Sequence, residues 1–142
     1  GINSAFISSY LFEVNSKKRL QLMQIAYNSL ETFYDDKIAT VTINDEQMRK
    51  YDASEDDVGS FVNIPRSLET AIVSMSFREL CDGSVKVSIR SQLVDVANLA
   101  RQYGGGGHER AAGCTVKGTL EDVKKKLILE AERRIKLEVR IR

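Results

Sequence analysis

Two alternating segments joined by a turn sequence constrain the fold of this chain more than any other feature. Apolar and polar residues alternate from 70 to 79, and the alternation returns from 85 to 90. Period-two alternation is typical of strands that bury one face. The linking segment, LCDGS, contains an Asp-Gly pair, which favours a tight turn. These segments therefore predict an antiparallel hairpin with one apolar and one polar face.

The register of this hairpin follows from the alternation. Side chains change face at every residue of a strand, so a slip of one residue would set the apolar face of one strand beside the polar face of the other. A two-residue Asp-Gly turn produces that mismatch, whereas a three-residue loop, 82–84, avoids it. We therefore expect Ser76 opposite Arg90 and Arg78 opposite Ser88. Both arginines then lie on the polar face, among serine hydroxyls.

Helix and strand signals precede the hairpin. Ser16 can cap a helix that ends at about residue 30, and the segments 30–34 and 37–43 are strand-like. Asn44 and Gln47 have the spacing of a capping box for a short helix. The apolar residues of the first helix that recur at helical spacing, and that we expect to face the core, are Leu20, Met23, Tyr27 and Leu30.

The segment 54–69 has no clear periodicity, and Pro65 favours an extended conformation for Ile64 before it. After the hairpin, Asp95 can cap a helix that ends at Tyr103, with Val96, Leu99 and Tyr103 facing inward.

A glycine run follows, and we expect one helical turn after it, from His108 to Ala112. A short strand is predicted at 114–118, and Thr119 can cap the last helix. The buried stripe of that helix is expected at Leu120, Val123, Leu127, Ala131 and Ile135.

Helices that alternate with strands and hairpins indicate an α/β (α+β) fold: a single domain with a mixed sheet of about five strands flanked by helices. The chain of 142 residues is long enough for one such core. Its net charge of +1 gives no overall field that would attract nucleic acid or a membrane, so any anion site must be local. No apolar run reaches the roughly 18 residues of a membrane span.

The two cysteines and one histidine argue against a structural zinc site. We expect Cys81 and Cys114 to be reduced thiols, as in a cytoplasmic protein. The first ten residues lack the basic and apolar regions of a signal peptide.

The segment RQYGGGGHERAAGC contains the only histidine of the chain. Ordered glycine is costly in backbone entropy, so four in a row indicate either a flexible loop or a backbone that approaches a ligand closely. A helix that began at His108 would place bare N–H groups where an anion could bind, which favours the second interpretation. The residue pattern leaves both open, and His108 beside the glycines can also be an incidental surface residue.

The arginines of the hairpin have two interpretations as well. Arg78 and Arg90 on an outer face can be merely solvated, but guanidinium groups on one face beside serines such as Ser88 can also hold phosphate. We find no paired carboxylates, no Ser/His/Asp arrangement and no P-loop lysine. The residues therefore indicate no catalytic site in this chain.

Three segments resemble one known family. YGGGGHERAAG resembles the GGGH-x-x-AAG signature of the DHH-associated domain, the C-terminal half of DHH-superfamily phosphoesterases. GSFVNIPRSLE is similar to the G-x-V-N-x-P segment of that family, and SFRELCDGSVKVSIRS is similar to its substrate-side hairpin. The resemblance covers about residues 16–135. Within the superfamily it points to the nano-RNases and 3′-phosphoadenosine-5′-phosphate phosphatases, often labelled exopolyphosphatase-related.

The resemblance implies a division of the chain and a role for it. Residues 1–15 would be an interdomain linker, 16–135 the substrate-binding domain and 136–142 a C-terminal tail. The catalytic domain of such enzymes lies upstream and holds two Mn²⁺ ions on Asp and His ligands. We therefore expect no catalytic residue, metal or cofactor here, and whether this chain alone is an enzyme stays open. Its parent would be a phosphodiesterase or phosphatase.

The resemblance also implies a ligand and its contacts. Partners would be a short oligoribonucleotide or a nucleotide phosphate and the missing catalytic domain, with a homodimer possible and no membrane. The substrate choice stays open between nano-RNA, phosphoadenosine phosphate and linear or cyclic dinucleotides. An alternative is an RNA-binding module similar to the C-terminal domain of alanyl-tRNA synthetases. The substrate-binding residues would be Asn63, Arg78, Ser88, Arg90, Gly104, Gly105, Gly106, Gly107 and His108.

Overall fold

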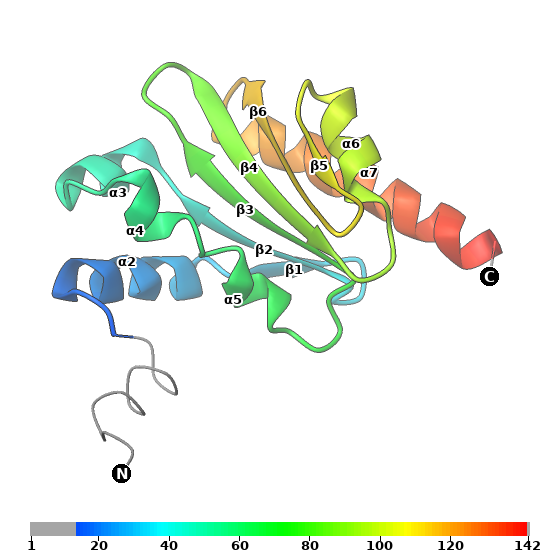
Figure 1. The fold of residues 1–142 in the computed structure, drawn as a ribbon, viewed down its shortest axis with the longest axis horizontal. Helices are drawn as coiled ribbons and strands as arrows, with labels where there is room; N and C mark the ends of the chain where they lie inside the picture. The colour runs from blue at the N-terminus through cyan, green and yellow to red at the C-terminus, as the bar shows by residue number, and fades with distance from the viewer. Residues whose placement is uncertain (1–13, 142) are drawn as a thin grey trace, which may run out of the picture.

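A six-stranded mixed sheet forms the centre of the computed structural model, which describes residues 14–141 (Figure 1). The strand order is β1-β2-β3-β4-β6-β5; β2 and β3 run parallel, and the other neighbours are antiparallel. The predicted α/β class and single mixed sheet are confirmed, with one strand more than expected. The strands are β1 (Glu31–Phe33), β2 (Ile38–Ile43), β3 (Val73–Glu79), β4 (Ser84–Ser91), β5 (Gly106–His108) and β6 (Ala111–Lys117).

Helices cover the two faces of the sheet unequally (Figure 1). Two of them lie on one face, and their apolar side chains form the main core with β3, β4 and β6. The other four pack over the β2 end of the opposite face, where they form a second, smaller core. The helices of the main core are α6 (Val96–Gln102) and α7 (Leu120–Ile141), and the others are α2 (Lys17–Asn28), α3 (Asp45–Lys50), α4 (Glu55–Val58) and α5 (Asn63–Arg66).

The alternation of the central hairpin places its apolar face on the main core. Met75 and Phe77 of β3 and Ile89 of β4 are fully or almost fully buried there. The last helix packs against this face with the predicted stripe: Val123, Leu127, Ala131 and Ile135 are buried, and Leu120 is partly buried. This helix continues to Ile141, so residues 136–141 are helical.

The predicted register of the hairpin is wrong, because each β3 residue pairs with a β4 residue two positions earlier in the chain than expected. The structure pairs Ser76 with Ser88 and Arg78 with Lys86, whereas we expected Ser76 opposite Arg90 and Arg78 opposite Ser88. The loop has the predicted three residues but spans 81–83, because the Leu80 N–H donates to the Ser84 carbonyl (2.8 Å). Gly83 takes the last loop position at φ +83°, a conformation that glycine adopts at least cost.

The face of α2 that packs inward is only partly the predicted one, since Met23 alone of the four expected residues packs against the second core. Leu22 and Ala26 are fully buried against the second core, while Leu20 and Tyr27, which we expected inside, are about half exposed. Both stripes are apolar, so helical spacing alone could not choose between them. The Ser16 cap is as predicted, since its hydroxyl accepts from the Arg19 N–H (3.1 Å).

The segment 54–69 is more regular than predicted. It contains α4 and α5, and Ile64 is helical rather than extended. Pro65 occupies the third position of α5, within the first turn, where no backbone N–H has a partner inside the helix. Its missing donor therefore costs the helix nothing, and the local preference of the residue before proline is overridden.

Two leucines of α2 test this packing. Replacing Leu22 by alanine removes a fully buried side chain and should lower the free energy of unfolding by about 2–5 kcal/mol. Replacing Leu20, which is 50% exposed, should change it by less than about 0.5 kcal/mol. Urea denaturation followed by circular dichroism measures both, and a larger loss for Leu20 than for Leu22 would show that α2 packs with the other face.

Candidate functional site

One half of a sheet face carries no helix among the residues that the structure describes. The second core covers this face over β2, through Val41 and Ile43. Across β4, β6 and β5, the residues on the same face, such as Lys86 and Arg90, remain partly exposed. The helices α4 and α5 flank this open surface on one side, and the β5–β6 hairpin forms its other edge (Figure 1).

The observed register arranges the open surface in rows, because paired residues of neighbouring strands share a face. The row nearest the β5–β6 turn is polar at three of its four positions, the middle row combines two serines with two glycines, and the third row carries two cations. In strand order β3, β4, β6, β5, the rows are Ser74, Arg90, Ala111, His108; then Ser76, Ser88, Gly113, Gly106; then Arg78, Lys86, Thr115.

Arg90 is a partly buried cation without an acidic partner. Its Nη1 donates to the carbonyl of Ile89 (3.0 Å), and no carboxylate within residues 14–141 lies within ion-pair distance of it. Burial lowers the pKa of Arg90, and the neighbouring Arg66 of α5 lowers it further. Arginine stays protonated under both influences. The result is a locally uncompensated positive charge, which favours the binding of an anion.

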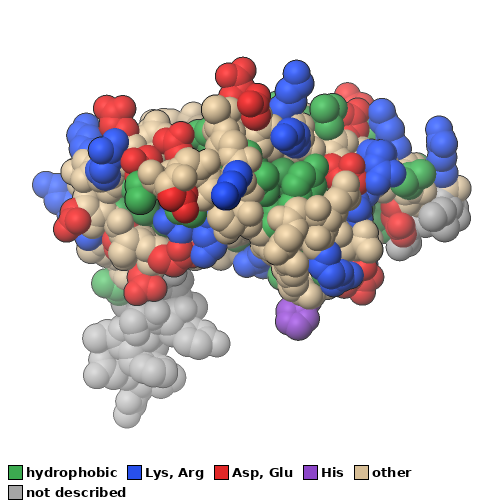
Figure 2. All heavy atoms as spheres, turned by 90° about the horizontal axis from the view of Figure 1, so that it is seen from above, with side chains coloured by type: hydrophobic (Ala, Val, Ile, Leu, Met, Phe, Trp, Pro, Cys, Tyr) green, Lys and Arg blue, Asp and Glu red, His purple; other side chains and the backbone are tan. Residues whose placement is uncertain are grey.

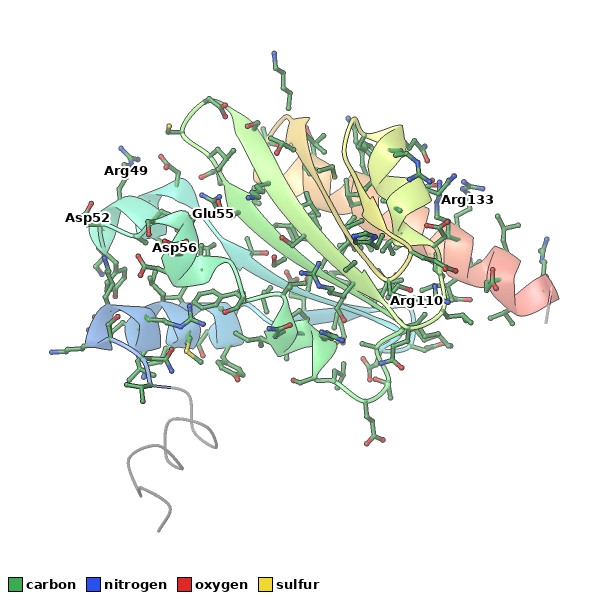
Figure 3. All side chains as sticks on the ribbon, viewed as in Figure 1. Arg49, Asp52, Glu55, Asp56, Arg110 and Arg133 are labelled. Atoms are coloured by element: carbon green, nitrogen blue, oxygen red, sulfur yellow. The ribbon has the colours of Figure 1, made fainter. Side chains whose placement is uncertain are left out.

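Arg78 and Lys86 differ from Arg90 in having an acidic partner. Both donate to the carboxylate of Glu55, the first residue of α4. Figure 3 shows Glu55 reaching from α4 toward the hairpin. The hydrogen bond from Lys86, followed by the charge of Arg78, lowers the pKa of Glu55, and partial burial opposes the shift. A small pocket of about 30 Å³, room for roughly one water molecule, lies here and is also lined by Ser76 and Ser88.

The glycine run forms a hairpin strand, not the entry to a helix. Residues Gly106–His108 are β5 and pair with β6, which begins at Ala111, so the predicted helical turn from His108 to Ala112 is wrong. Tertiary pairing decides this, because β6 lies between β4 and β5 and its backbone groups bond to both. The sequence did contain a signal for this strand, because apolar residues alternate with glycine or polar residues at Ala112, Cys114 and Val116.

The glycines are not equivalent. Gly104 adopts φ +82° after the end of α6, as predicted for a helix terminus. A Cβ on Gly105 would approach the Cβ of Cys114 to 2.6 Å, and one on Gly107 would approach the Cα of Ala112 to 2.6 Å, at φ +141°. A Cβ on Gly106 would meet no atom within 4 Å. Three glycines are thus required by close packing or backbone conformation, and the fourth faces open space.

The tip of the β5–β6 hairpin is tied to its surroundings. The carbonyl of Arg110 accepts from the Ser91 N–H, and the carbonyl of Glu109 accepts from the Val96 N–H, both at 3.0 Å. The Arg110 guanidinium donates to the Val94 carbonyl (3.1 Å), and Figure 3 shows this arginine at the hairpin tip. His108 precedes the turn and is exposed, and the one histidine projects from the surface in Figure 2. The hairpin therefore presents His108 on an anchored backbone.

Asn63 lies apart from the other predicted residues. It is exposed at the start of α5 and lines a groove between α2 and α5 together with Arg19 and Tyr27. Phe61 lines both this groove and the pocket at Ser76 and Ser88. The structure thus brings Ser88, Arg90, Gly106 and His108 onto one surface with Arg78 at its far end, while Asn63 faces a neighbouring groove. The alternation of β4 already placed Lys86 on the face of Arg90, but sequence reasoning did not single it out. It missed Glu55 and Arg66, which only the tertiary structure brings to this surface.

The described residues offer no metal site. No group of three or more His, Cys, Asp or Glu side chains in 14–141 could hold an ion, so a pair of Mn²⁺ ions does not fit the residues present. Among the same residues, no helix has the length and apolar character of a membrane span. This surface can bind an anionic ligand through its cations, its serine hydroxyls and the exposed backbone of its glycines.

Comparison with known proteins identifies the class. The DHHA1 domain family matches residues 35–137, and the chain therefore belongs to this family. The predicted resemblance to the DHH-associated domain is confirmed.

Two individual relatives show which members of the family this chain is similar to. A bifunctional oligoribonuclease and PAP phosphatase NrnA of Thermus thermophilus is 44% identical over 81 residues, which are 56% of this chain and 25% of the relative. A probable bifunctional oligoribonuclease and PAP phosphatase NrnA of Streptococcus mutans is 27% identical over 75 residues, 53% of this chain and 24% of the relative. The match thus spans about a quarter of the length of these relatives.

Two solved structures share the fold. An exopolyphosphatase-related protein from Bacteroides fragilis superposes with a TM-score of 0.78 at 30% identity, over 92% of this chain and 38% of the other. A pGpG-specific phosphodiesterase, PggH, from Vibrio cholerae superposes with a TM-score of 0.54 at 14% identity, over 83% of this chain and 40% of the other. At that identity the second likeness concerns the fold alone.

Two glycine variants test the assignment of the hairpin. Gly107→Ala should destabilise the domain by more than about 1 kcal/mol, because the new Cβ meets β6 and the backbone is left-handed. Gly106→Ala should be tolerated within about 0.5 kcal/mol, since its Cβ points into open space. Thermal and urea denaturation measure both. Equal destabilisation would mean that Gly106 is also held by packing.

The two thiols should differ in reactivity. Burial raises the pKa of the Cys114 thiol to about 11, whereas Cys81 is exposed in the β3–β4 loop. The thiolate is the reactive form, so at pH 8 a disulfide reagent should modify Cys81 rapidly and Cys114 only after unfolding. A Cys81→Ser variant that still reacted rapidly in the folded state would contradict the burial of Cys114 under the glycine hairpin.

Proposed function

We propose that this chain is the substrate-binding domain of a DHH-family phosphoesterase that acts on short oligoribonucleotides or 3′-phosphoadenosine-5′-phosphate. The observation that carries the proposal is Arg90, a partly buried guanidinium with no acidic partner among residues 14–141, on an open sheet surface beside Arg66. The membership in the DHHA1 family and the likeness to a relative named as an oligoribonuclease and PAP phosphatase support it.

A terminal phosphate of the ligand fits beside Arg90. Its guanidinium can donate two hydrogen bonds to phosphate oxygens, and Arg66 adds positive charge from the flanking α5. The Ser88 hydroxyl lies one step of two residues along the same face of β4 and can donate a further bond. His108 shares a row with Arg90, two strands away, at roughly 10 Å by the usual spacing of strands.

The floor between these side chains leaves room for the ligand. Ala111 separates Arg90 from His108 in their row, and Gly113 and Gly106 continue the next row with backbone alone. A sugar or base can therefore approach the sheet closely, and the N–H groups of an anchored hairpin need no reorganisation on binding. This arrangement gives Gly106, the glycine that packing does not require, a reason to lack a side chain.

The domain would position the substrate and would not itself cleave a bond. Catalysis would belong to a domain outside this chain that holds the two Mn²⁺ ions, which would activate water and stabilise the leaving oxygen when bound. The residues described here would hold the phosphate and nucleoside so that the scissile bond faces that domain. Correct placement of a bound substrate can account for several kcal/mol of a barrier, roughly 7–11 in favourable cases.

Ligand binding tests this function. The chain should bind a 5′-phosphorylated diadenylate in isothermal titration, and Arg90→Ala should weaken binding at least about tenfold, because a charge-assisted bidentate contact is lost. In an enzyme that joins the chain to its catalytic domain, the same variant should raise KM much more than it lowers kcat. His108→Ala should act in the same direction.

The control is Arg133→Ala on α7, an exposed arginine paired with Glu130 and distant from the open surface (Figure 3). It should leave binding unchanged. Equal affinity of the wild-type chain and the Arg90 variant for the diadenylate would refute the proposed function, and preference for a folded tRNA over the diadenylate would favour an RNA-binding module instead.

A further inference from the structure

A second pair of cations lies at the other end of the open surface. Arg78 and Lys86 are directly opposite each other on β3 and β4. Like charges in such a cross-strand pair repel, so the pair is unfavourable unless an anion lies between them. Lys86 is four residues from Arg90 along β4, a distance of about 13 Å at the usual rise per residue.

Glu55 provides that anion from α4. Its carboxylate accepts from both cations, and its side chain is 51% exposed. One carboxylate opposes two positive charges, so the cluster keeps a net charge of +1. Exposed ion pairs of this kind contribute little to stability. A more highly charged anion from solution can therefore compete with Glu55 for the two cations.

Two serine hydroxyls connect the ends of the surface. Ser76 and Ser88 are cross-strand partners, and they lie on the polar face between Arg90 and the Arg78–Lys86 pair. Neither hydroxyl makes a hydrogen bond to any residue that the structure describes, and both line the small pocket beside Glu55. We call the five residues Arg90, Ser88, Ser76, Arg78 and Lys86 the polar track. It offers donors along one straight segment of two paired strands.

We propose that Arg78 and Lys86 form a second phosphate site, which Glu55 occupies in the free chain and which a second phosphate of a bound oligonucleotide takes over. This inference rests on the proposed function, because the first phosphate lies at Arg90. A ligand with one phosphate cannot reach both ends of a track of about 13 Å. The exchange of Glu55 for phosphate therefore makes binding depend on ligand length, and Glu55 sets how strongly longer ligands are preferred.

Two variants separate the parts of this site. Glu55→Gln removes the competing charge and keeps the size of the side chain, so it should raise the affinity for hexa-adenylate about tenfold. Lys86→Met removes one cation and keeps an apolar chain of similar length, so it should lower the same affinity about tenfold. Neither should change the affinity for adenosine 5′-monophosphate, held at Arg90, by more than about twofold. Isothermal titration of the chain with both ligands measures these ratios, and circular dichroism confirms that each variant is folded.

Asp56→Asn is the matched control. Asp56 follows Glu55 on α4 (Figure 3), but its side chain takes part in no ion pair among the described residues. The substitution removes the same unit of charge one residue away. It should leave the preference for hexa-adenylate unchanged, and an effect equal to that of Glu55→Gln would refute a specific exchange, since general repulsion of the nucleic acid would then explain both.

The outcomes distinguish this inference from the function on which it rests. If Arg90→Ala weakens both ligands but Glu55→Gln and Lys86→Met leave their affinity ratio unchanged, the second site is refuted and the proposed function stands. If neither ligand binds the chain, or Arg90→Ala has no effect on either, the proposed function fails and the second site with it. Opposite shifts of hexa-adenylate affinity in the two variants, with an unchanged monophosphate affinity, would establish the second site.

Discussion

The central β3–β4 hairpin holds the domain together by dividing two environments between its faces. Its odd-numbered residues, such as Met75 and Ile89, are buried under α6 and α7, and its even-numbered residues, such as Ser76 and Arg90, lie on the opposite face. A register change of one residue would bury arginines and expose the core, at a cost far above the stability of a domain. The placement of Arg78, Lys86 and Arg90 on the open surface therefore depends on the same alternation that forms the core.

The open surface exists because one face of the sheet is only half covered. The helices α2–α5 bury Val41 and Ile43 of β2, and no helix within residues 14–141 lies over β4, β6 and β5 on that face. Close packing of the β5–β6 hairpin needs glycine at 105 and 107, where a Cβ would meet β6. At the outer edge of the sheet the backbone is therefore not covered by side chains at these glycines, and the hairpin tip is held in place. Such an edge suits a ligand that contacts backbone groups directly.

Charge on this surface is local rather than global. The chain has a net charge of only +1, yet Arg66 and Arg90 lie together without an acidic partner in the described part of the chain, and Arg78 and Lys86 share one carboxylate. A site of this kind attracts an anion at short range although the chain as a whole is close to neutral. The two ends differ in that Glu55 compensates one of them, which is why we assign them different roles in binding.

Sequence periodicity determined the elements whose two faces differ in polarity: both strands of the hairpin, the stripe of α7 and the capped starts of α2, α3 and α6. The same alternation placed Arg78 and Arg90 on one face, and the resemblance of the glycine and VNIP segments to known motifs indicated the family. Local preferences could not decide between the two apolar stripes of α2, the position of the hairpin loop or the structure after the glycines. There the tertiary structure decided, because β6 forms backbone bonds on both sides and so overrides the helical tendency of its alanines. It also decided the surroundings of the two arginines, because Glu55 beside Arg78 and Arg66 beside Arg90 come from helices distant in sequence, α4 and α5.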